Sequence, residues 1–492
     1  MSPTLLLACM LGYFAILLGV AWFTGRRADN ASFFIGNRNS HWWMVAFGMI
    51  GTSLSGVTFI SVPGAVGDGG FTYFVIVLGQ TIGYLVIALV LLPLYYRLKL
   101  TSIYAYLGTR LGPRSYRSGA AFFILSRTLG ATARLYLVIA ILQDAILMRL
   151  GVPFWLTTGV ILAMILLYTY QGGVKTIVWT DMLQTVCMLA GLAVCAALLG
   201  ERLELSLPAG YTAMREAGIA TLWVTDPLSN LFWLKQLVAG VFIAIAMTGM
   251  DQEMMQKNIS VRTLRDSQKN LLTMSSIMLC VVLLFLWLGG LLHLFAGAQG
   301  LHITGDQLFP AVVLGYLPEW VQIMFVIALI SALFPSADGA ITALTSSVCI
   351  DLIGMNRRDW DEAAKTRVRH RVHLGFAGLF LLLVLVFKWI ANPSMIGLIL
   401  KIAAFTYGPL LGLFAFGILT RRVVNDRLAP WAALAAPLLC YLLDSFQQSL
   451  LGGYRIGLEI LLINGLIVFA GLWLLSQPAA VAADRLAPVE LH

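Results

Sequence analysis

The sequence predicts an all-α polytopic membrane protein with about thirteen transmembrane helices. Of its 492 residues, 60% are hydrophobic and only 11% are charged, and the mean hydropathy of +0.88 is far above that of water-soluble domains. Apolar runs of roughly 17 to 30 residues, each long enough to cross a bilayer as a helix, recur along the whole chain. They give candidate spans at residues 3–24, 42–67, 71–97, 118–148, 154–170, 177–200, 231–250, 271–297, 319–350, 371–391, 394–420, 430–450 and 456–476.

The distribution of basic residues predicts the orientation of these spans. Loops after odd-numbered spans, together with the C-terminal tail, hold 23 of the 32 Lys and Arg residues, whereas the loops on the other side hold five. The positive-inside rule then places the protein in the cell (inner) membrane with its N-terminus outside and its C-terminus in the cytoplasm. The net charge of +9 therefore reflects the orientation of the protein in the membrane and does not indicate a nucleic acid partner.

The segment 42–70 differs from the other spans because glycines and hydroxyls interrupt it. Three glycines and five hydroxyl residues fall within fourteen positions: Gly48, Gly51, Gly56, Thr52, Ser53, Ser55, Thr58 and Ser61. Glycine tolerates an unwound backbone, which in hydrocarbon must be buried in protein or must line a watery cavity. The residues alone leave two interpretations open: a discontinuous helix that carries a binding site, or close helix packing through small residues.

A second interrupted helix is predicted at residues 231–250, which contain Gly240, Thr248 and Gly249 and exit into the polar stretch 251–257. It follows the first by five spans, as expected if spans 2–6 and 7–11 form two inverted five-helix repeats, each opening with a broken helix. The predicted organisation is an N-terminal helix and cytoplasmic loop (1–41), a first repeat (42–200), an extracytoplasmic loop (201–230), a second repeat (231–420), and two C-terminal helices with a cytoplasmic tail (421–492).

Two arginines, Arg127 and Arg134, lie seven residues apart in the fourth span and hence on one helical face. An arginine at a helix centre costs about 2.5 to 3.5 kcal/mol, so Arg134 should face protein or water and should have an anionic or carbonyl partner. That partner is either a substrate carboxylate or an intramembrane acid, of which the candidates are Asp144, Asp181 and Asp338. For Arg127, nearer the cytoplasmic end, a structural role is expected.

A short cytoplasmic turn is expected at residues 170–175, leading into the sixth span. Asp181 lies about one turn inside that span, where a carboxylate could also simply favour the helix dipole. The ninth span is rich in hydroxyls, and hydroxyl and carbonyl oxygens are what a dehydrated Na⁺ needs. Pro335 in the middle of this span leaves the carbonyl of Ser331 without its helical hydrogen bond. The freed carbonyl either binds an ion or only accompanies a kink, and the intramembrane Asp338 favours ion binding.

Other classes of protein find little support in the sequence. The six cysteines lie within predicted spans without CxxC spacing and are interpreted as packing residues. No HExxH, Ser/His or paired-carboxylate pattern is present, so neither an enzyme nor a bound cofactor is predicted. No obligate protein partner is evident, and the expected partners are the bilayer and small solutes.

These stretches together resemble the sodium:solute symporter family, which includes sodium-coupled proline, galactose and sialic acid transporters. The resemblance covers about residues 5 to 475. It rests on the broken span and on GGVKTIVWTDMLQ (172–184), GMDQEMMQKN (249–258) and SADGAITALTSSVCIDL (336–352). It implies thirteen helices with an outside N-terminus, ten of which form a LeuT-like inverted repeat, and symport of a solute with Na⁺ as the coupling ion.

The resemblance also implies sodium ligands. The main site would consist of three backbone carbonyls and one hydroxyl, from Gly51, Leu54, Ala332 and Ser336. Pro335 stands where the family has a further hydroxyl, and Ser331, Ser336 or water would compensate for it. In the sialic acid branch an aspartate resembling Asp181 serves a second sodium site, to which Asp338 could add here.

The sialic acid branch further implies substrate contacts from Ser53, Ser55, Thr58, Gln80 and Arg134. At Val57 and Val77 this chain has valines where the galactose branch has polar side chains. We therefore expect Na⁺-coupled symport of a small polar solute with a carboxylate, and sialic acid is the most specific candidate. The alternatives are a proton-coupled transporter of the same fold, in which Asp181 or Asp338 titrates, and sodium-coupled uptake of a sugar or amino acid.

Overall fold

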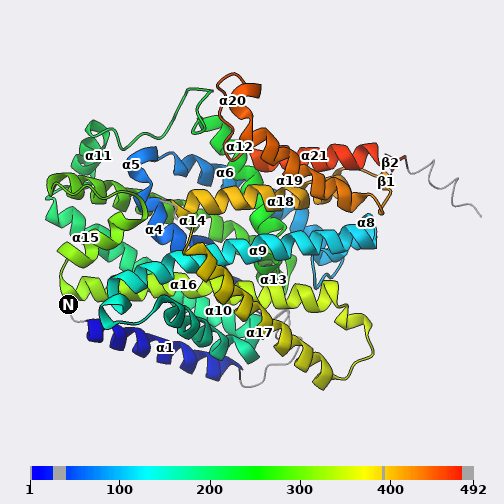
Figure 1. The fold of residues 1–492 in the computed structure, drawn as a ribbon, viewed down its shortest axis with the longest axis horizontal. Helices are drawn as coiled ribbons and strands as arrows, with labels where there is room; N and C mark the ends of the chain where they lie inside the picture. Colours follow the sequence, from blue (N-terminus) through cyan, green and yellow to red (C-terminus); the bar gives the residue numbers. More distant parts are fainter. Residues whose placement is uncertain (1–2, 26–39, 391–393, 479–492) are drawn as a thin grey trace, which may run out of the picture.

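The computed structural model describes residues 3–25, 40–390 and 394–478, and most of them are α-helical. Many helices run along the long axis of the molecule (Figure 1). Up to the second break they are α1 (Pro3–Gly25), α3 (Trp42–Leu54), α4 (Gly56–Gly64), α5 (Val66–Gly69), α6 (Tyr73–Val86), α7 (Leu92–Arg97), α8 (Ala105–Arg110), α9 (Pro113–Leu142), α10 (Phe154–Arg202), α11 (Leu207–Glu216) and α12 (Trp233–Ala244). After it come α13 (Gln252–Ile259), α14 (Leu264–Ala298), α15 (Leu308–Tyr316), α16 (Glu319–Ser347), α17 (Glu362–Phe387), α18 (Met395–Leu419), α19 (Ala429–Ser445), α20 (Gln447–Leu450) and α21 (Ile460–Leu474).

Short irregular elements complete the chain. The π-helical segments η2 (Ile87–Leu91), η3 (Gln143–Leu147), η5 (Ile245–Gly249) and η7 (Val348–Leu352) directly follow α6, α9, α12 and α16. The strands β1 (Val423–Val424) and β2 (Ser476–Gln477) form one antiparallel pair. This pair joins the segment before α19 to the segment after α21.

The predicted all-α membrane fold is confirmed. Within the described residues, eight helices are long and apolar enough to cross a membrane, and ten if each bent pair counts as one span. Three shorter apolar helices, Phe154–Leu167, Ala429–Ser445 and Ile460–Leu474, fall on further predicted spans. The count of thirteen crossings stays a prediction.

Both predicted broken helices are interrupted. The axes of α3 and α4 differ by 53°, and Ser55 between them has a non-helical backbone with φ 19° and ψ 165°. The helix α12 with η5 is bent by 66° from α13 at Met250 and Asp251. The second break departs from prediction on its far side, because residues 252–259 form the buried helix α13 in place of a polar exit loop. Partners distant in sequence make this burial possible.

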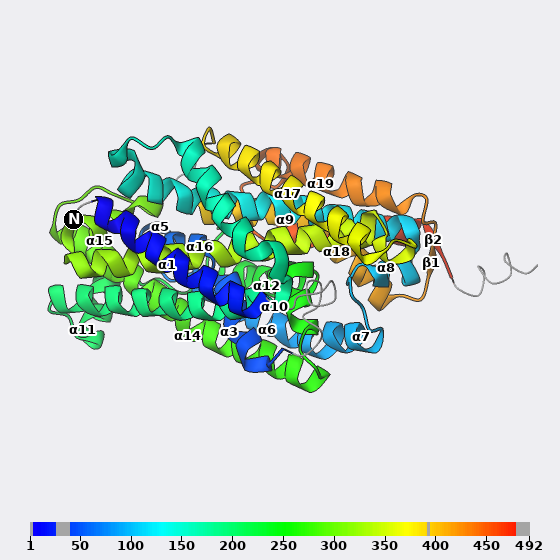
Figure 2. The ribbon, with the colours of Figure 1, turned by 90° about the horizontal axis from the view of Figure 1, so that it is seen from below.

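The predicted turn at residues 170–175 is wrong, because α10 is helical throughout from Phe154 to Arg202. The ribbon changes direction within this helix in Figure 2. Gly172 and Gly173 are adjacent at this point of the sequence, and glycine pairs are a common cause of sharp helix kinks. The chain therefore reverses by bending a helix and not by leaving it.

The best-buried spanning helix is α16, which carries the hydroxyl-rich ninth span. In its most apolar window 78% of the residues are buried, against 33% for α1 at the periphery. Elsewhere, glycines allow backbones to touch. A Cβ on Gly79 of α6 would lie 2.0 Å from the Leu237 carbonyl oxygen, and one on Gly240 of α12 would lie 2.1 Å from the Ile76 carbonyl oxygen. Small residues thus set the spacing between α6 and α12.

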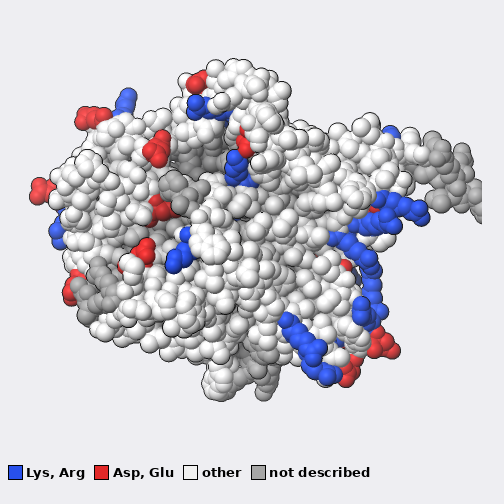
Figure 3. Space-filling model, viewed as in Figure 1, with Lys and Arg blue, Asp and Glu red and all other residues white. Residues whose placement is uncertain are grey.

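Charge is distributed unevenly between the two ends of the molecule. Figure 3 shows a group of Lys and Arg side chains at the end opposite the N-terminus. Exposed residues of this kind include Arg114, Arg358 and Arg421. α8 and the β1–β2 pair lie at the same end (Figure 1).

Candidate functional site

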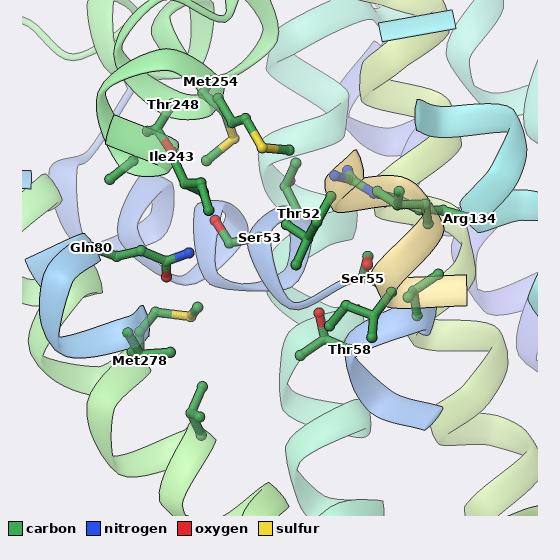
Figure 4. Close-up of a pocket in the computed structure, with 18 of the residues that line it drawn as sticks. Thr52, Ser53, Ser55, Thr58, Gln80, Arg134, Ile243, Thr248, Met254 and Met278 are labelled. Atoms are coloured by element: carbon green, nitrogen blue, oxygen red, sulfur yellow. The ribbon is translucent and has the colours of Figure 1, made fainter. Parts of the chain in front are cut away.

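A cavity of about 100 Å³ lies at the first break, between the two broken helices and α6, α9, α14 and α18. Five polar residues predicted to contact a substrate all line it: Ser53, Ser55, Thr58, Gln80 and Arg134. Figure 4 shows Ser53 and Gln80 on one side of the cavity, and Arg134, Ser55 and Thr58 on the other. The structure therefore brings together residues from α3, α4, α6 and α9 that the sequence separates by up to about eighty positions.

The break itself presents these hydroxyls. The Ser55 N–H still donates to the Gly51 carbonyl, at 3.2 Å, before the helix ends. The hydroxyl of Ser53 is buried without a hydrogen-bond partner among the described residues. A buried hydroxyl without a partner costs free energy, so a polar solute in the cavity would compensate for it.

Arg134 projects toward the cavity without an ion pair or hydrogen bond to any described residue. In particular, none of the three candidate acids, Asp144, Asp181 and Asp338, forms an ion pair with it. Arg127, on the same face of α9, differs because it contacts the Glu253 carboxylate directly. The alternative that Arg134 pairs with an intramembrane acid thus has no support in this geometry, whereas Arg127 has the structural partner expected for it.

Buried charges of alternating sign form a chain that begins at the cavity wall with Arg127. Arg127 bonds to Glu253, and its other guanidinium nitrogen lies 3.9 Å from Asp251. Lys257 Nζ lies 3.6 Å from Glu253 Oε1 and 2.7 Å from Asp181 Oδ2. The chain joins α9, the second broken helix and α10, and buried charges of this kind are tolerated only when they are paired.

Sequence reasoning missed this chain because it assigned residues 251–257 to a cytoplasmic loop and counted Lys257 among the loop cations. All of these residues are buried. A signal was present: the apolar Met254 and Met255 interrupt the polar stretch, and Glu253 precedes Lys257 by four positions, which is a stabilising helical spacing. Asp251 also begins α13 as its N-cap, since its carboxylate accepts the Met254 N–H at 3.1 Å.

The residues of the predicted main sodium site lie where α16 crosses the first break. Gly51 and Leu54 belong to the last turn of α3. The Ala332 carbonyl oxygen would lie 3.6 Å from a Cβ on Gly56, so it faces the break. The Ser336 hydroxyl is buried and donates to the Leu333 carbonyl, at 2.7 Å. This donor set of carbonyl and hydroxyl oxygens suits a dehydrated monovalent cation.

The other residues considered for ion binding do not all face the first break. Ser331 does not turn its hydroxyl to the break, because this hydroxyl donates to Tyr13 of α1 at 2.7 Å. Pro335 lies within an uninterrupted α16. Asp181 and Asp338 are both fully buried, and Asp181 bonds to Lys257 and Thr52. Of the residues named to compensate for Pro335, Ser336 is the better placed.

A larger hollow of about 460 Å³ adjoins the cavity and shares Tyr73 and Leu400 with it. Its polar lining includes Asp68, Asp306 and Lys401. Tyr73 and Leu400 therefore lie between the cavity and this vestibule, so that a solute in the vestibule has to pass these two side chains.

A polytopic helical protein in which two interrupted helices enclose a polar cavity has the architecture of a secondary transporter. The model of the sodium:solute symporter family matches residues 33–435. The chain belongs to this family.

Individual relatives agree with this assignment. The chain is 26% identical over 434 residues to human sodium-coupled monocarboxylate transporter 1, an alignment that covers 82% of this chain and 67% of the transporter. It is 22% identical over 440 residues to the sodium/sialic acid symporter SiaT of Proteus mirabilis (strain HI4320), covering 84% of each. The solved structure of a Na⁺-coupled sialic acid symporter in a substrate-bound outward-open state matches with a TM-score of 0.81, at 19% identity over 98% of both chains. The predicted LeuT-like fold is confirmed.

Proposed function

We propose that the protein is a secondary active transporter that carries a small carboxylate across the cell membrane together with Na⁺. The observation that carries this proposal is Arg134, a guanidinium at the cavity that forms no ion pair or hydrogen bond with any described residue, while Glu253 and Asp251 act on it only at longer range. A bound carboxylate supplies the missing partner, and an arginine holds such a group with two parallel hydrogen bonds. The family and the sodium coupling named in its relatives support the choice of ion.

The rest of the cavity supports a substrate that bears hydroxyls next to its carboxylate. Gln80, across the cavity from Arg134 (Figure 4), would bind a second polar group of the solute, and the hydroxyls of Ser53, Ser55 and Thr58 would bind substrate hydroxyl groups. An apolar wall also lines the cavity, with Ile243, Met247, Met278, Val282, Ile396 and Ile399. Such a wall favours a solute with one charged end and one apolar end.

Size separates two candidate substrates. The cavity has a volume of about 100 Å³, which is room for several water molecules. A short hydroxy-monocarboxylate fits with little adjustment, whereas sialic acid requires side chains such as Tyr73 and Leu400 to move toward the vestibule. Relatives carry both kinds of name, so both belong in the assay.

Sodium enters the proposed cycle as a second cargo at the first break. Bound to the carbonyls of Gly51, Leu54 and Ala332 and the hydroxyl of Ser336, it would tie α3 to α16 beside the substrate. Each cargo then binds better when the other is present, by a reciprocal free energy of roughly 1 to 3 kcal/mol. The membrane potential adds about 2.3 kcal/mol per charge per 100 mV, and rocking of one helix bundle would expose the site to the other side.

The orientation follows from charge. With the basic end of Figure 3 in the cytoplasm, the N-terminus and the vestibule face outward, as the positive-inside rule requires. In this proposal the chain moves its cargo unchanged and performs no covalent chemistry. Its partners are then the solute, Na⁺ and the bilayer.

Uptake into proteoliposomes tests the proposal. Labelled lactate and sialic acid are offered under an inward Na⁺ gradient, with choline as the control cation, and separately under a proton gradient at equal Na⁺ on both sides. We expect accumulation of at least one carboxylate with Na⁺ and none with choline. Accumulation driven by the proton gradient and indifferent to Na⁺ would favour the proton-coupled alternative, which Pro335 at an expected ligand position makes worth testing.

A further inference from the structure

Lys257 places its ammonium group beside the Asp181 carboxylate. At this carboxylate the resemblance to the sialic acid branch implies a second sodium ion. The Lys257 Nζ donates to Asp181 Oδ2 at 2.7 Å and to Thr52 Oγ1 at 2.6 Å. We propose that this ammonium is the resident cation of the Asp181 site, so that the transporter couples one Na⁺ per cycle and not two. The proposal rests on the sodium coupling proposed above and specifies its stoichiometry.

The charge of Lys257 disfavours a second ion beside Asp181, even though Asp181 Oδ1 has no hydrogen-bond partner among the described residues. An ammonium has three donors, and the two short bonds of Lys257 have the length typical of charge-assisted hydrogen bonds. Its third oxygen neighbour is Glu253 Oε1, at 3.6 Å. A Na⁺ on the same carboxylate would lie a few ångströms from a full positive charge, in a region where both side chains are buried. At such separations in a protein interior two positive charges repel each other strongly.

Lys257 also makes the connection that a bound ion would make. Thr52 lies on α3 next to the first break, Asp181 lies on α10, and Lys257 itself lies on α13 beyond the second break. The ammonium therefore links both broken helices to α10. Because this cation is covalently attached, it stays with the protein through the cycle and adds no ion to the transported charge.

Without Lys257 the same place would attract a cation. Asp181 on α10 and Glu253 on α13 both contact the ammonium, and the charge of Asp338 on α16 also acts on it. Arg127 would still pair with Glu253. Removing the ammonium leaves the Asp181 carboxylate buried with no ion-pair partner among the described residues. A soluble Na⁺ is then the available replacement.

The Na⁺ dependence of uptake by the full-length protein in proteoliposomes tests this. We expect wild type to show a Hill coefficient near 1 for Na⁺ and a measured ratio of one ²²Na⁺ per substrate. The Lys257→Met variant should acquire a second Na⁺ requirement, seen as a Hill coefficient rising toward 2 and a larger Na⁺-induced rise in melting temperature. The Lys257→Arg variant is the matched control for charge, and it should keep a Hill coefficient near 1 for Na⁺ even if its uptake rate changes.

A wild-type Hill coefficient near 2 that falls to 1 in Asp181→Asn would overturn the resident-cation proposal. So would a Lys257→Met protein whose response to Na⁺ matches wild type. If Lys257→Met does not fold, the Asp181→Asn/Lys257→Met double variant removes both charges together, and its melting temperature should respond to Na⁺ as wild type does; a larger response would contradict the proposal. Uptake that is equal in choline and in Na⁺ would instead refute the proposed function, so the two failures are distinguishable.

Discussion

The two arginines of α9 offer a matched pair of substitutions that separate substrate binding from folding. Both line the cavity, but Arg134 has no ion-pair partner among the described residues, whereas Arg127 is ion-paired to Glu253. In Arg134→Gln the protein loses only bonds to the substrate, and hydrogen bonds to a charged group contribute about 1.5 to 3 kcal/mol. At 1.4 kcal/mol per factor of ten, the affinity for a carboxylate should fall about ten- to hundredfold.

The expected effects on stability run the other way. Arg134→Gln removes a charge that has no ion-pair partner among the described residues, so the melting temperature of the substrate-free protein should stay level or rise. Arg127→Gln leaves Glu253 buried with Lys257, 3.6 Å away, as its remaining ion-pair partner among the described residues. Breaking a buried pair costs about 3 to 5 kcal/mol, so this variant should melt well below wild type.

The assay measures two quantities on each purified variant: the melting temperature without substrate, and the dissociation constant for lactate or sialic acid from the substrate-induced thermal shift. An Arg134→Gln protein that binds the carboxylate within twofold of wild type would refute the role given to this residue. Equal loss of melting temperature in both variants would show that Arg134 has a structural partner after all.

Three further substitutions test the packing and the ion site. Gly56→Ala would place a methyl 2.2 Å from Val138 Cγ2, so initial uptake should fall sharply and recover in part when Val138→Ala is added. Gly79→Ala would place a Cβ 2.0 Å from a backbone carbonyl of α12 and should lower the melting temperature by several degrees, while Gly378→Ala, with nothing within 4 Å, should not. Pro335→Ser supplies the hydroxyl that the family has at this position and should lower the Na⁺ concentration for half-maximal uptake; an unchanged value would exclude this position from the ion site.

The spans and both breaks could be predicted from the sequence because they depend on local properties. A run of apolar residues is a spanning helix wherever it lies, and glycine beside hydroxyls weakens a helix in any context. The cavity residues could be named for a related reason, since Ser53 and Ser55 lie at the break itself. Arg134 is singled out by the cost of an arginine in mid-span, which requires an anionic or carbonyl partner, whereas Gln80 follows from the family resemblance.

The buried helix α13 could not be predicted in this way. Its charged residues predict an exposed loop because burying a charge is costly. The partners that offset this cost, Asp181 and Arg127, lie far away in the sequence. The partners of the two arginines on α9 are likewise distant in sequence and could not be predicted. Their spacing placed them on one face, but only the fold shows that Glu253 reaches one of them and leaves the other to the cavity.

The last turn of α3 connects the proposed functions of the site. Gly51, Thr52 and Ser53 are consecutive, and in a helix consecutive side chains point about 100° apart. Thr52 accepts a bond from the Lys257 ammonium, Ser53 lines the cavity, and Gly51 belongs to the proposed sodium site. A shift of this one turn therefore moves a solute contact, an ion ligand and the link to the second broken helix together. Because the backbone of a helical turn is stiff, a solute that moves Ser53 also moves Gly51, and an ion that moves Gly51 also moves Ser53. Coupled transport requires such a mechanical link between the two proposed binding sites.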